Sequence, residues 1–204
     1  MMKLYDFSLF PNPRRARIFI AEKALQIPIE QVDALAGANR TPEFLRKNPS
    51  GGLPVLELDD GSCLAESVAI CRYLEGLHPN PNLMGRDSRE QAFIEQWNRR
   101  MELELFSVVE RFFQNTGAFF KGRVPQFPEY GELQRANVVQ RLRRMDAELA
   151  GREFVAADRY TIADITALVG IDLFCGYGGQ PFPADLTNLK RWHQAVSSRP
   201  SAKA

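Results

Sequence analysis

The chain is predicted to fold as an α/β N-terminal half, with elements in the order β-α-β-α-β-β-α, followed by an all-helical half. Short alternating segments separated by turn signals predict the first part. Regular patterning then breaks where prolines and asparagines crowd into His78-Pro79-Asn80-Pro81-Asn82-Leu83. Beyond this break only helical periodicity is found. We therefore expect a first domain over residues 1–78, a linker over 79–87 and a helical domain over 88–204.

Bulk composition narrows the function classes. The 204 residues are 45% hydrophobic, and 26 Lys and Arg against 25 Asp and Glu leave a net charge of +1. This balance gives no electrostatic reason to expect nucleic acid or an anionic membrane as partner. No signal peptide or run of about 18 apolar residues is found, so no membrane crossing is expected. The partner should be a small molecule or another protein.

Cysteine and histidine usage predicts no metal site. Cys63, Cys71 and Cys175 lack metal-ligand spacing and are expected to be reduced packing residues, which implies a reducing cytoplasm. His78 and His193 also lack paired ligand spacing.

The first residues predict a parallel β-α-β unit. Lys3 to Phe7 alternates like a strand, and prolines then impose a loop. Asn12 before Pro13 is typical of a helix start, and the apolar stripe that follows ends near Gln26. Ile29 to Val32 is the second predicted strand, joined to the first by a right-handed crossover.

A short helix, a hairpin and a third helix should complete the first domain. Thr41 is expected to begin the short helix, with Pro42 in its first turn. Val55 to Leu58 and Ser62 to Leu64 flank a turn closed by Gly61, which predicts an antiparallel hairpin. Glu66 or Ser67 then begins a helix.

The second half is predicted to hold four helices. Apolar residues at steps of three or four mark a long helix from about Ser88 to Thr116. The next helix has an apolar stripe from Leu133 to Leu149, and its arginines are expected on the solvent face: Arg135, Arg141, Arg143 and Arg144. Thr161 and Asp164 predict a capping box at the start of the third. The last should run from about Leu186 to Val196.

Four motifs in order resemble those of a glutathione transferase, and the resemblance covers essentially the whole chain. In chain order they are Arg15-Ala16-Arg17-Ile18, Gly52-Leu53-Pro54-Val55-Leu56, Glu66-Ser67-Val68-Ala69-Ile70, and the run from Phe154-Val155-Ala156 to Thr161-Ile162-Ala163-Asp164. The resemblance implies a thioredoxin-like first domain that binds glutathione. It leaves the transferase class open, although the first loop is most similar to nu-like and theta-like members.

The resemblance implies a role for each candidate in the glutathione site. Pro54 would form a cis peptide bond, leaving the Leu53 backbone N–H and carbonyl to pair with the cysteinyl part of glutathione. Ser67, at a helix N-terminus, would hold the γ-glutamyl carboxylate, and Glu66 the ammonium group. The simpler alternative is that Pro54 starts an edge strand in trans and that Ser67 only caps its helix.

Asn39 and Arg40 precede the short helix, where the resemblance places residues that hold the glycine carboxylate of glutathione. A guanidinium can bind a carboxylate with two donors. A surface arginine without a ligand is the equally weighted alternative.

The first loop should contain the catalytic group that favours the thiolate. Phe10 stands where zeta-like and omega-like relatives have Ser or Cys, which argues against glutaredoxin-like and isomerase activities. Asn12 resembles a nu-like asparagine near the glutathione sulfur, and its amide could donate to a thiolate. Ser8 is the second candidate, and Tyr5 is interpreted as a packing residue in the strand.

The acceptor pocket is expected between the domains, lined by Phe10, Arg99, Phe106 and Phe113, although an aromatic stripe is more often core. The predicted activity is conjugation of glutathione to a small hydrophobic electrophile by a cytoplasmic homodimer. Two alternatives remain: a nu-like glutathione-dependent disulfide reductase and a non-catalytic interaction protein with the transferase fold.

Overall fold

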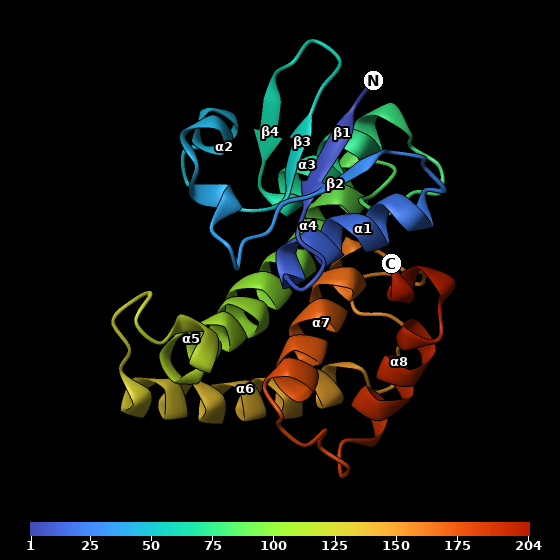
Figure 1. Cartoon of the computed structure of the whole chain (residues 1–204). Helices are drawn as coiled ribbons and strands as arrows, with labels where there is room; N and C mark the ends of the chain where they lie inside the picture. Colours follow the sequence, from blue (N-terminus) through green and yellow to red (C-terminus); the bar gives the residue numbers. More distant parts are fainter. The chain divides into compact units, whose positions relative to one another are not determined.

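Four strands form one mixed sheet in the order β2-β1-β3-β4 in the computed structural model, which describes residues 1–204 (Figure 1). Strand β1 (Lys3–Asp6) pairs in parallel with β2 (Ile29–Gln31) and antiparallel with β3 (Val55–Glu57). Strand β4 (Cys63–Ala65) pairs antiparallel with β3. The predicted parallel β-α-β unit and antiparallel hairpin are both confirmed.

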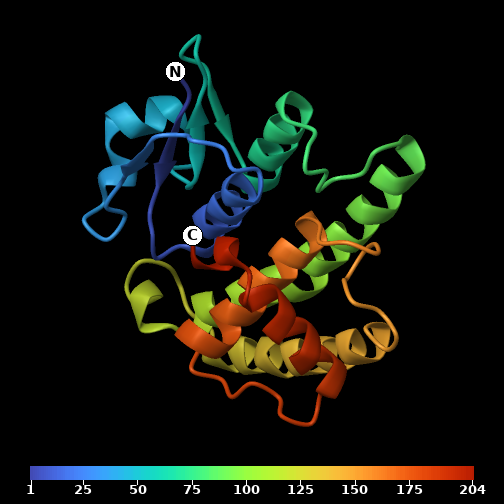
Figure 2. The same cartoon turned by 90° about the vertical axis from the view of Figure 1, so that its right-hand side faces the viewer.

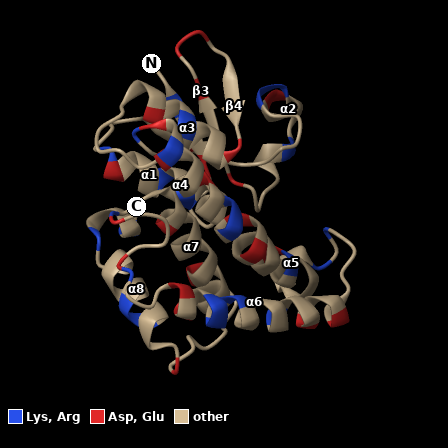
Figure 3. Ribbon diagram, turned by 180° about the vertical axis from the view of Figure 1, so that it is seen from behind, with Lys and Arg blue, Asp and Glu red and all other residues tan.

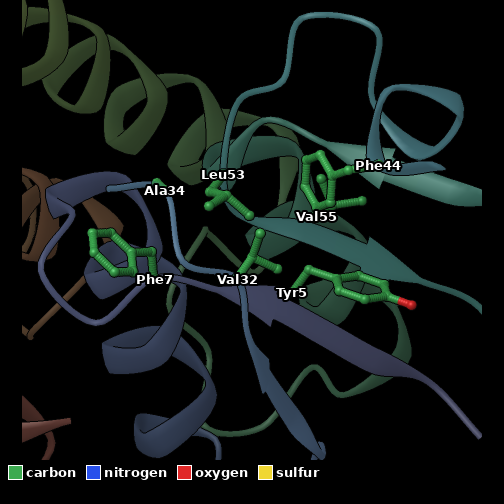
Figure 4. Packing of buried hydrophobic residues seen from close by; sticks show 7 residues of the cluster. All are labelled: Tyr5, Phe7, Val32, Ala34, Phe44, Leu53 and Val55. Carbon is green, nitrogen blue, oxygen red and sulfur yellow. The ribbon is translucent and has the colours of Figure 1, made fainter. Parts of the chain in front are cut away.

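Helices cover both sides of this sheet (Figure 2). Helix α2 (Pro42–Lys47) lies on one side, while α1 (Pro11–Glu22) and α3 (Ser67–Leu77) pack against each other on the other. Successive side chains of each strand point to opposite faces of the sheet. On the α2 side, a hydrophobic cluster contains Tyr5, Phe7, Val32, Ala34, Phe44, Leu53 and Val55 (Figure 4).

Helix α1 begins earlier than predicted. Its first residue is Pro11, and Phe10 is the N-cap in an extended conformation, so Asn12 lies inside the first turn and does not cap the helix. Prolines at positions 11 and 13 are tolerated there because the first N–H groups of a helix have no intrahelical partner. The helix also ends at Glu22 and not near Gln26.

The chain divides into two compact units. One consists of Met1–Leu83 together with Pro200–Ala204, and the other of Met84–Arg199. The last residues form a short 3₁₀ turn that contacts α1 (Figure 1). The Arg14 guanidinium donates to the Ala202 carbonyl at 3.0 Å, and the Ser201 hydroxyl donates to Glu22.

The second unit is entirely helical apart from its loops and one isolated bridge. Helix α4 (Ser88–Arg100) continues through a π-helical segment at Met101–Phe106 into α5 (Ser107–Thr116). The remaining helices are α6 (Pro128–Glu148), α7 (Ile162–Asp172) and α8 (Thr187–Ser197). Every residue from Ile162 to Ile171 is buried, which makes α7 the centre of this unit. No helix combines the length and apolar character needed to span a membrane.

The predicted capping arrangement at α7 is confirmed. One Asp164 oxygen accepts from the Thr161 backbone N–H at 3.0 Å and from the Thr161 hydroxyl at 3.1 Å. The other accepts from the Val155 N–H at 2.8 Å and from the Trp192 indole N–H at 2.9 Å. Burial raises the pKa of the Asp164 carboxyl, and these hydrogen bonds oppose that shift.

The prediction that Arg141 lies on the solvent face of α6 is wrong. This side chain is buried, its Nη1 atom lies 3.0 Å from Glu148 and its Nε atom 3.3 Å from Glu104. Arg144 also pairs with Glu104. Basic and acidic residues are mixed along α6 (Figure 3), so the arginine cluster is balanced by carboxylates.

Candidate functional site

The Leu53-Pro54 peptide bond is cis, as the resemblance implied. Leu53 is 8% exposed, and its side chain points into the cluster with Val32 and Val55 (Figure 4). No hydrogen bond within the protein involves the Leu53 N–H or carbonyl. Buried peptide groups are almost always paired, so an unpaired N–H and carbonyl beside β3 can accept an extended peptide in a strand-like arrangement.

The N-terminus of α3 holds the two predicted charge-binding residues. Glu66 precedes the helix with a φ of 68°, in the left-handed region that a glutamate rarely adopts. Its carboxylate is exposed and forms no ion pair within the protein. Ser67 is the first helical residue and is buried. The helix end therefore offers N–H donors and a hydroxyl beside an anionic side chain, a combination that suits a zwitterion.

Asn39 and Arg40 bind the turn that leads to Leu53. The Asn39 amide donates to the Gly51 carbonyl, and the Arg40 guanidinium to the Ser50 carbonyl, both at 2.8 Å. Asn39 is buried, whereas Arg40 is exposed and has further guanidinium N–H groups. Their observed contacts order the protein's own backbone, and a contact with a ligand carboxylate remains a prediction.

Asn12 and Ser8, the two polar catalytic candidates of the first loop, lie in different surroundings. The Ser67 hydroxyl donates to Asn12 Oδ1 at 3.4 Å, so Asn12 lies beside the helix end that holds Ser67. The Ser8 side chain is exposed, and its backbone N–H donates to Gln31 Oε1 at 3.0 Å. Phe10 is half-buried and packs edge-on against Phe7, with ring centroids 4.9 Å apart.

Buried polar residues that support this loop were not identified from the sequence. Asp6 is fully buried; it pairs with Arg17 at 2.6 Å and accepts from the Gln31 amide at 2.5 Å. Arg17 also donates to the Ser8 carbonyl at 3.1 Å, which ties the loop to β1 and β2. A carboxylate at the end of an apolar strand followed by several arginines is the only sequence signal that could have suggested this pair.

Tyr5 is a packing residue, as predicted. Its ring lies in the cluster on the α2 side of the sheet, and its hydroxyl donates to Glu57 Oε2 at 2.8 Å. Lys47 pairs with the same carboxylate at 2.7 Å. The tyrosine hydroxyl is therefore engaged at the sheet and is separate from the Asn12 and Ser67 pair.

The residues predicted to line an acceptor pocket are placed only within their own units. Phe106 is 1% exposed and packs against Gly170 of α7, as a core residue does. Phe113 packs edge-on against Phe112, and Arg99 pairs with Glu102 on the surface of α4. A pocket formed by these side chains and Phe10 remains a prediction.

The three cysteines are free thiols. Burial raises the pKa of Cys71 to about 12 and that of Cys175 to about 11, and it also raises the pKa of Cys63. Each thiol is therefore held in the protonated form, which is the less nucleophilic one. None of them lies in the first loop, so a thiolate at this site has to come from the ligand.

Comparison with known proteins identifies the class of protein that this fold and site define. Residues 11–77 match the family model for the N-terminal domain of glutathione S-transferases, and residues 97–200 match the model for their C-terminal domain. The chain belongs to the glutathione S-transferase family.

Individual relatives agree with this membership. Glutathione S-transferase 2 of Saccharomyces cerevisiae is 35% identical over 206 residues, covering 99% of this chain and 88% of that protein. A glutathione S-transferase domain-containing protein of Marinobacter aquaeolei is 37% identical in a solved structure, with a TM-score of 0.90 over 98% of both chains. Human elongation factor 1-gamma is 30% identical over 97% of this chain, which spans 45% of that longer protein.

Proposed function

We propose that the protein conjugates the thiolate of glutathione to a small hydrophobic electrophile. The observation that carries the proposal is that the same unit presents two features: Leu53, a buried residue whose N–H and carbonyl have no partner within the protein, and the helix end with Glu66 and Ser67. An extended tripeptide with a zwitterionic γ-glutamyl end satisfies both features. Family membership and a relative named glutathione S-transferase 2 support the same conclusion.

Each part of glutathione then has a proposed partner. The cysteinyl backbone pairs with Leu53 next to Pro54, the γ-glutamyl carboxylate binds Ser67, and the ammonium group binds Glu66. Asn39 and Arg40 assist at the glycine carboxylate. Asn12 and the positive end of α1 stabilise the thiolate, since a hydrogen-bond donor and a helix N-terminus both lower a thiol pKa.

The acceptor site and assembly are proposed on family membership. Phe10, Arg99 and Phe113 would contribute to the acceptor site, whereas Phe106 is buried in the core of the helical unit, and the enzyme would act as a cytoplasmic homodimer. Light scattering of the purified protein, which reports its mass in solution, tests the dimer.

Reduction of a small disulfide is the second candidate activity. It is favoured by Asn12, which resembles the first-loop asparagine of nu-like transferases, and by Phe10, which replaces the usual hydroxyl or thiol of that loop. In that reaction the glutathione thiolate attacks the disulfide substrate, and one substrate thiolate leaves. A second glutathione thiolate then releases the other substrate thiolate and forms oxidised glutathione.

Calorimetric titration with reduced and oxidised glutathione tests the site, and assays with a chloronitroaromatic acceptor and a small disulfide test the reaction. We expect binding of reduced glutathione and aryl transfer. Strong disulfide reduction with negligible aryl transfer would select the second activity. Absence of binding for both forms would contradict both activities and favour a non-catalytic interaction protein with this fold.

A further inference from the structure

Arg15 is a buried cation behind the N-terminus of α3. Only 1% of its surface is exposed, although it lies in α1 among three arginines within four residues, Arg14, Arg15 and Arg17. Charged side chains are seldom buried so completely without a specific role. Its Nη1 atom donates to the Ser67 hydroxyl oxygen at 3.3 Å.

The two neighbouring arginines have different partners. Arg14 donates to the Ala202 carbonyl, and Arg17 pairs with Asp6. Of the three, Arg15 is the one whose observed hydrogen bond reaches the proposed glutathione site. Arg14 is therefore a matched control. It carries the same charge and lies in the same helix, but its observed hydrogen bond is to the Ala202 carbonyl.

The contact with Arg15 determines how Ser67 can use its hydroxyl. A guanidinium has only donors, so the Ser67 oxygen must be the acceptor in this hydrogen bond. The single hydroxyl proton is then directed elsewhere, and the Ser67 hydroxyl donates to Asn12 Oδ1 at 3.4 Å. Both distances are longer than the usual range for their type, so both hydrogen bonds are weak. The hydroxyl proton can therefore move to a stronger acceptor that binds beside it.

A carboxylate at the start of α3 is such an acceptor. Charge-assisted hydrogen bonds are shorter and stronger than neutral ones, so the hydroxyl would favour a carboxylate over an amide oxygen. The positive charge of Arg15 adds to the positive end of the helix dipole on the same side. Arg15 also opposes the effect of burial on the pKa of Cys71, which is consistent with a charge that acts within the interface between α1 and α3.

We propose that Arg15 is a positioning residue that keeps the Ser67 hydroxyl a donor toward the γ-glutamyl carboxylate of glutathione. This proposal rests on the proposed function. When the carboxylate binds, the Ser67 hydroxyl transfers its hydrogen bond from Asn12 Oδ1 to the ligand.

A double-mutant cycle with two ligands tests this role. The variants are Arg15→Met, Arg15→Lys, Ser67→Ala and the double change of Arg15→Met with Ser67→Ala, with Arg14→Met as control. Calorimetry measures the affinity of each full-length variant for glutathione and for γ-aminobutyryl-cysteinylglycine, which lacks the α-carboxylate. Thermal unfolding checks that each variant is folded.

We expect Arg15→Met to weaken glutathione binding by about 10- to 100-fold, which corresponds to one lost charge-assisted hydrogen bond. Arg15→Lys keeps the charge and should lose less. In the Ser67→Ala background, Arg15→Met should change the affinity by less than about twofold, because residues that act through one another are not additive. Its effect on the carboxylate-free analogue should be equally small, and Arg14→Met should bind both ligands normally.

An equal loss of affinity for both ligands, or full additivity in the cycle, would overturn the proposal and leave Arg15 a merely structural residue. If Arg15→Met does not fold, Arg15→Lys replaces it in the same cycle, with the same two criteria. A wild-type protein that binds neither ligand contradicts the proposed function itself. A wild-type protein that binds glutathione while its Arg15 variants bind equally well contradicts only this inference.

Discussion

The side-chain amide of Asn39 donates a hydrogen bond to the Gly51 carbonyl at 2.8 Å, so the turn before Leu53 is held from a distant segment. Gly51 has a φ of 65°, and a Cβ atom there would lie 2.7 Å from Arg40 Nη1 and 2.8 Å from the Asn39 carbonyl oxygen. The close approach requires glycine at this position.

Gly51→Ala should therefore destabilise the protein by about 2 to 3 kcal/mol, combining the cost of a positive φ with that of the steric clash. Gly61→Ala is the matched control, because Gly61 also has a positive φ, of 84°, but a Cβ atom there would meet no other atom within 4 Å. It should cost only about 1 kcal/mol. Urea unfolding measures both, and equal losses would show that the contact with Asn39 and Arg40 does not constrain Gly51.

Glu66→Gln should weaken glutathione binding by about 1 to 3 kcal/mol, since it removes the charged partner of the ligand's ammonium group. The change keeps the size of the side chain at a residue with a φ of 68°, so backbone geometry is little affected. Glu43→Gln, at an exposed position in α2, should bind glutathione normally. Calorimetry compares the two variants, and an unchanged affinity of Glu66→Gln for glutathione would show that Glu66 does not bind the ligand.

Asn12→Ala should lower turnover by about 10- to 100-fold while changing glutathione affinity much less, because its amide is proposed to act on the thiolate. The measurement is kcat and the glutathione dissociation constant of each variant. Ser8→Ala is the comparison, since the Ser8 side chain is exposed in the same loop. Loss of activity in Ser8→Ala with a normal Asn12→Ala enzyme would reverse the assignment.

Lowering the pH should reduce the stability of the helical unit, because the Glu90 carboxylate becomes protonated. A hydrogen bond from Arg159 lowers the pKa of this carboxyl from 4.5 to about 2. A depressed native pKa stabilises the fold above pH 4.5, and that stabilisation is lost as the pH falls toward 2. Between pH 5 and 3, Glu90→Gln should lose about 1 kcal/mol less stability than the wild type. Glu129→Gln, on an exposed residue of α6, should follow the wild-type curve, and an identical curve for Glu90→Gln would contradict the expectation.

Elements with strong local signals were predictable from the sequence. Thr41 accepts from the Phe44 N–H at 3.3 Å as the cap of α2, and Gly61 closes the hairpin, because both depend on residues a few positions apart. The start of α1 is less predictable, since Pro11 and Asn12 both suit a first turn. Local chemistry does not decide which residue comes first.

Buried charges depend on contacts between distant residues, which the sequence did not reveal. Arg141 belongs to an arginine-rich helix, yet it is buried against Glu104 and Glu148. Arg15 belongs to a family-like motif, but nothing in that pattern shows that it reaches Ser67 across 52 positions. For the proposed site, the sequence predicted Glu66 and Ser67 at a helix start, whereas their supporting side chains required the structure.

The contact of Pro200–Ala204 with α1 means that the sheet-bearing unit is discontinuous along the chain. Residues 84–199 are, in topological terms, an insertion between the body of that unit and its last turn. A fragment cut after Leu83 would therefore lack Ser201 and Ala202, and the surface of α1 that they cover would be exposed to water. The helix that carries Asn12 and Arg15 packs against a segment that lies beyond the whole helical unit in the sequence, so the sheet-bearing unit is not contained in any continuous fragment that stops at Leu83.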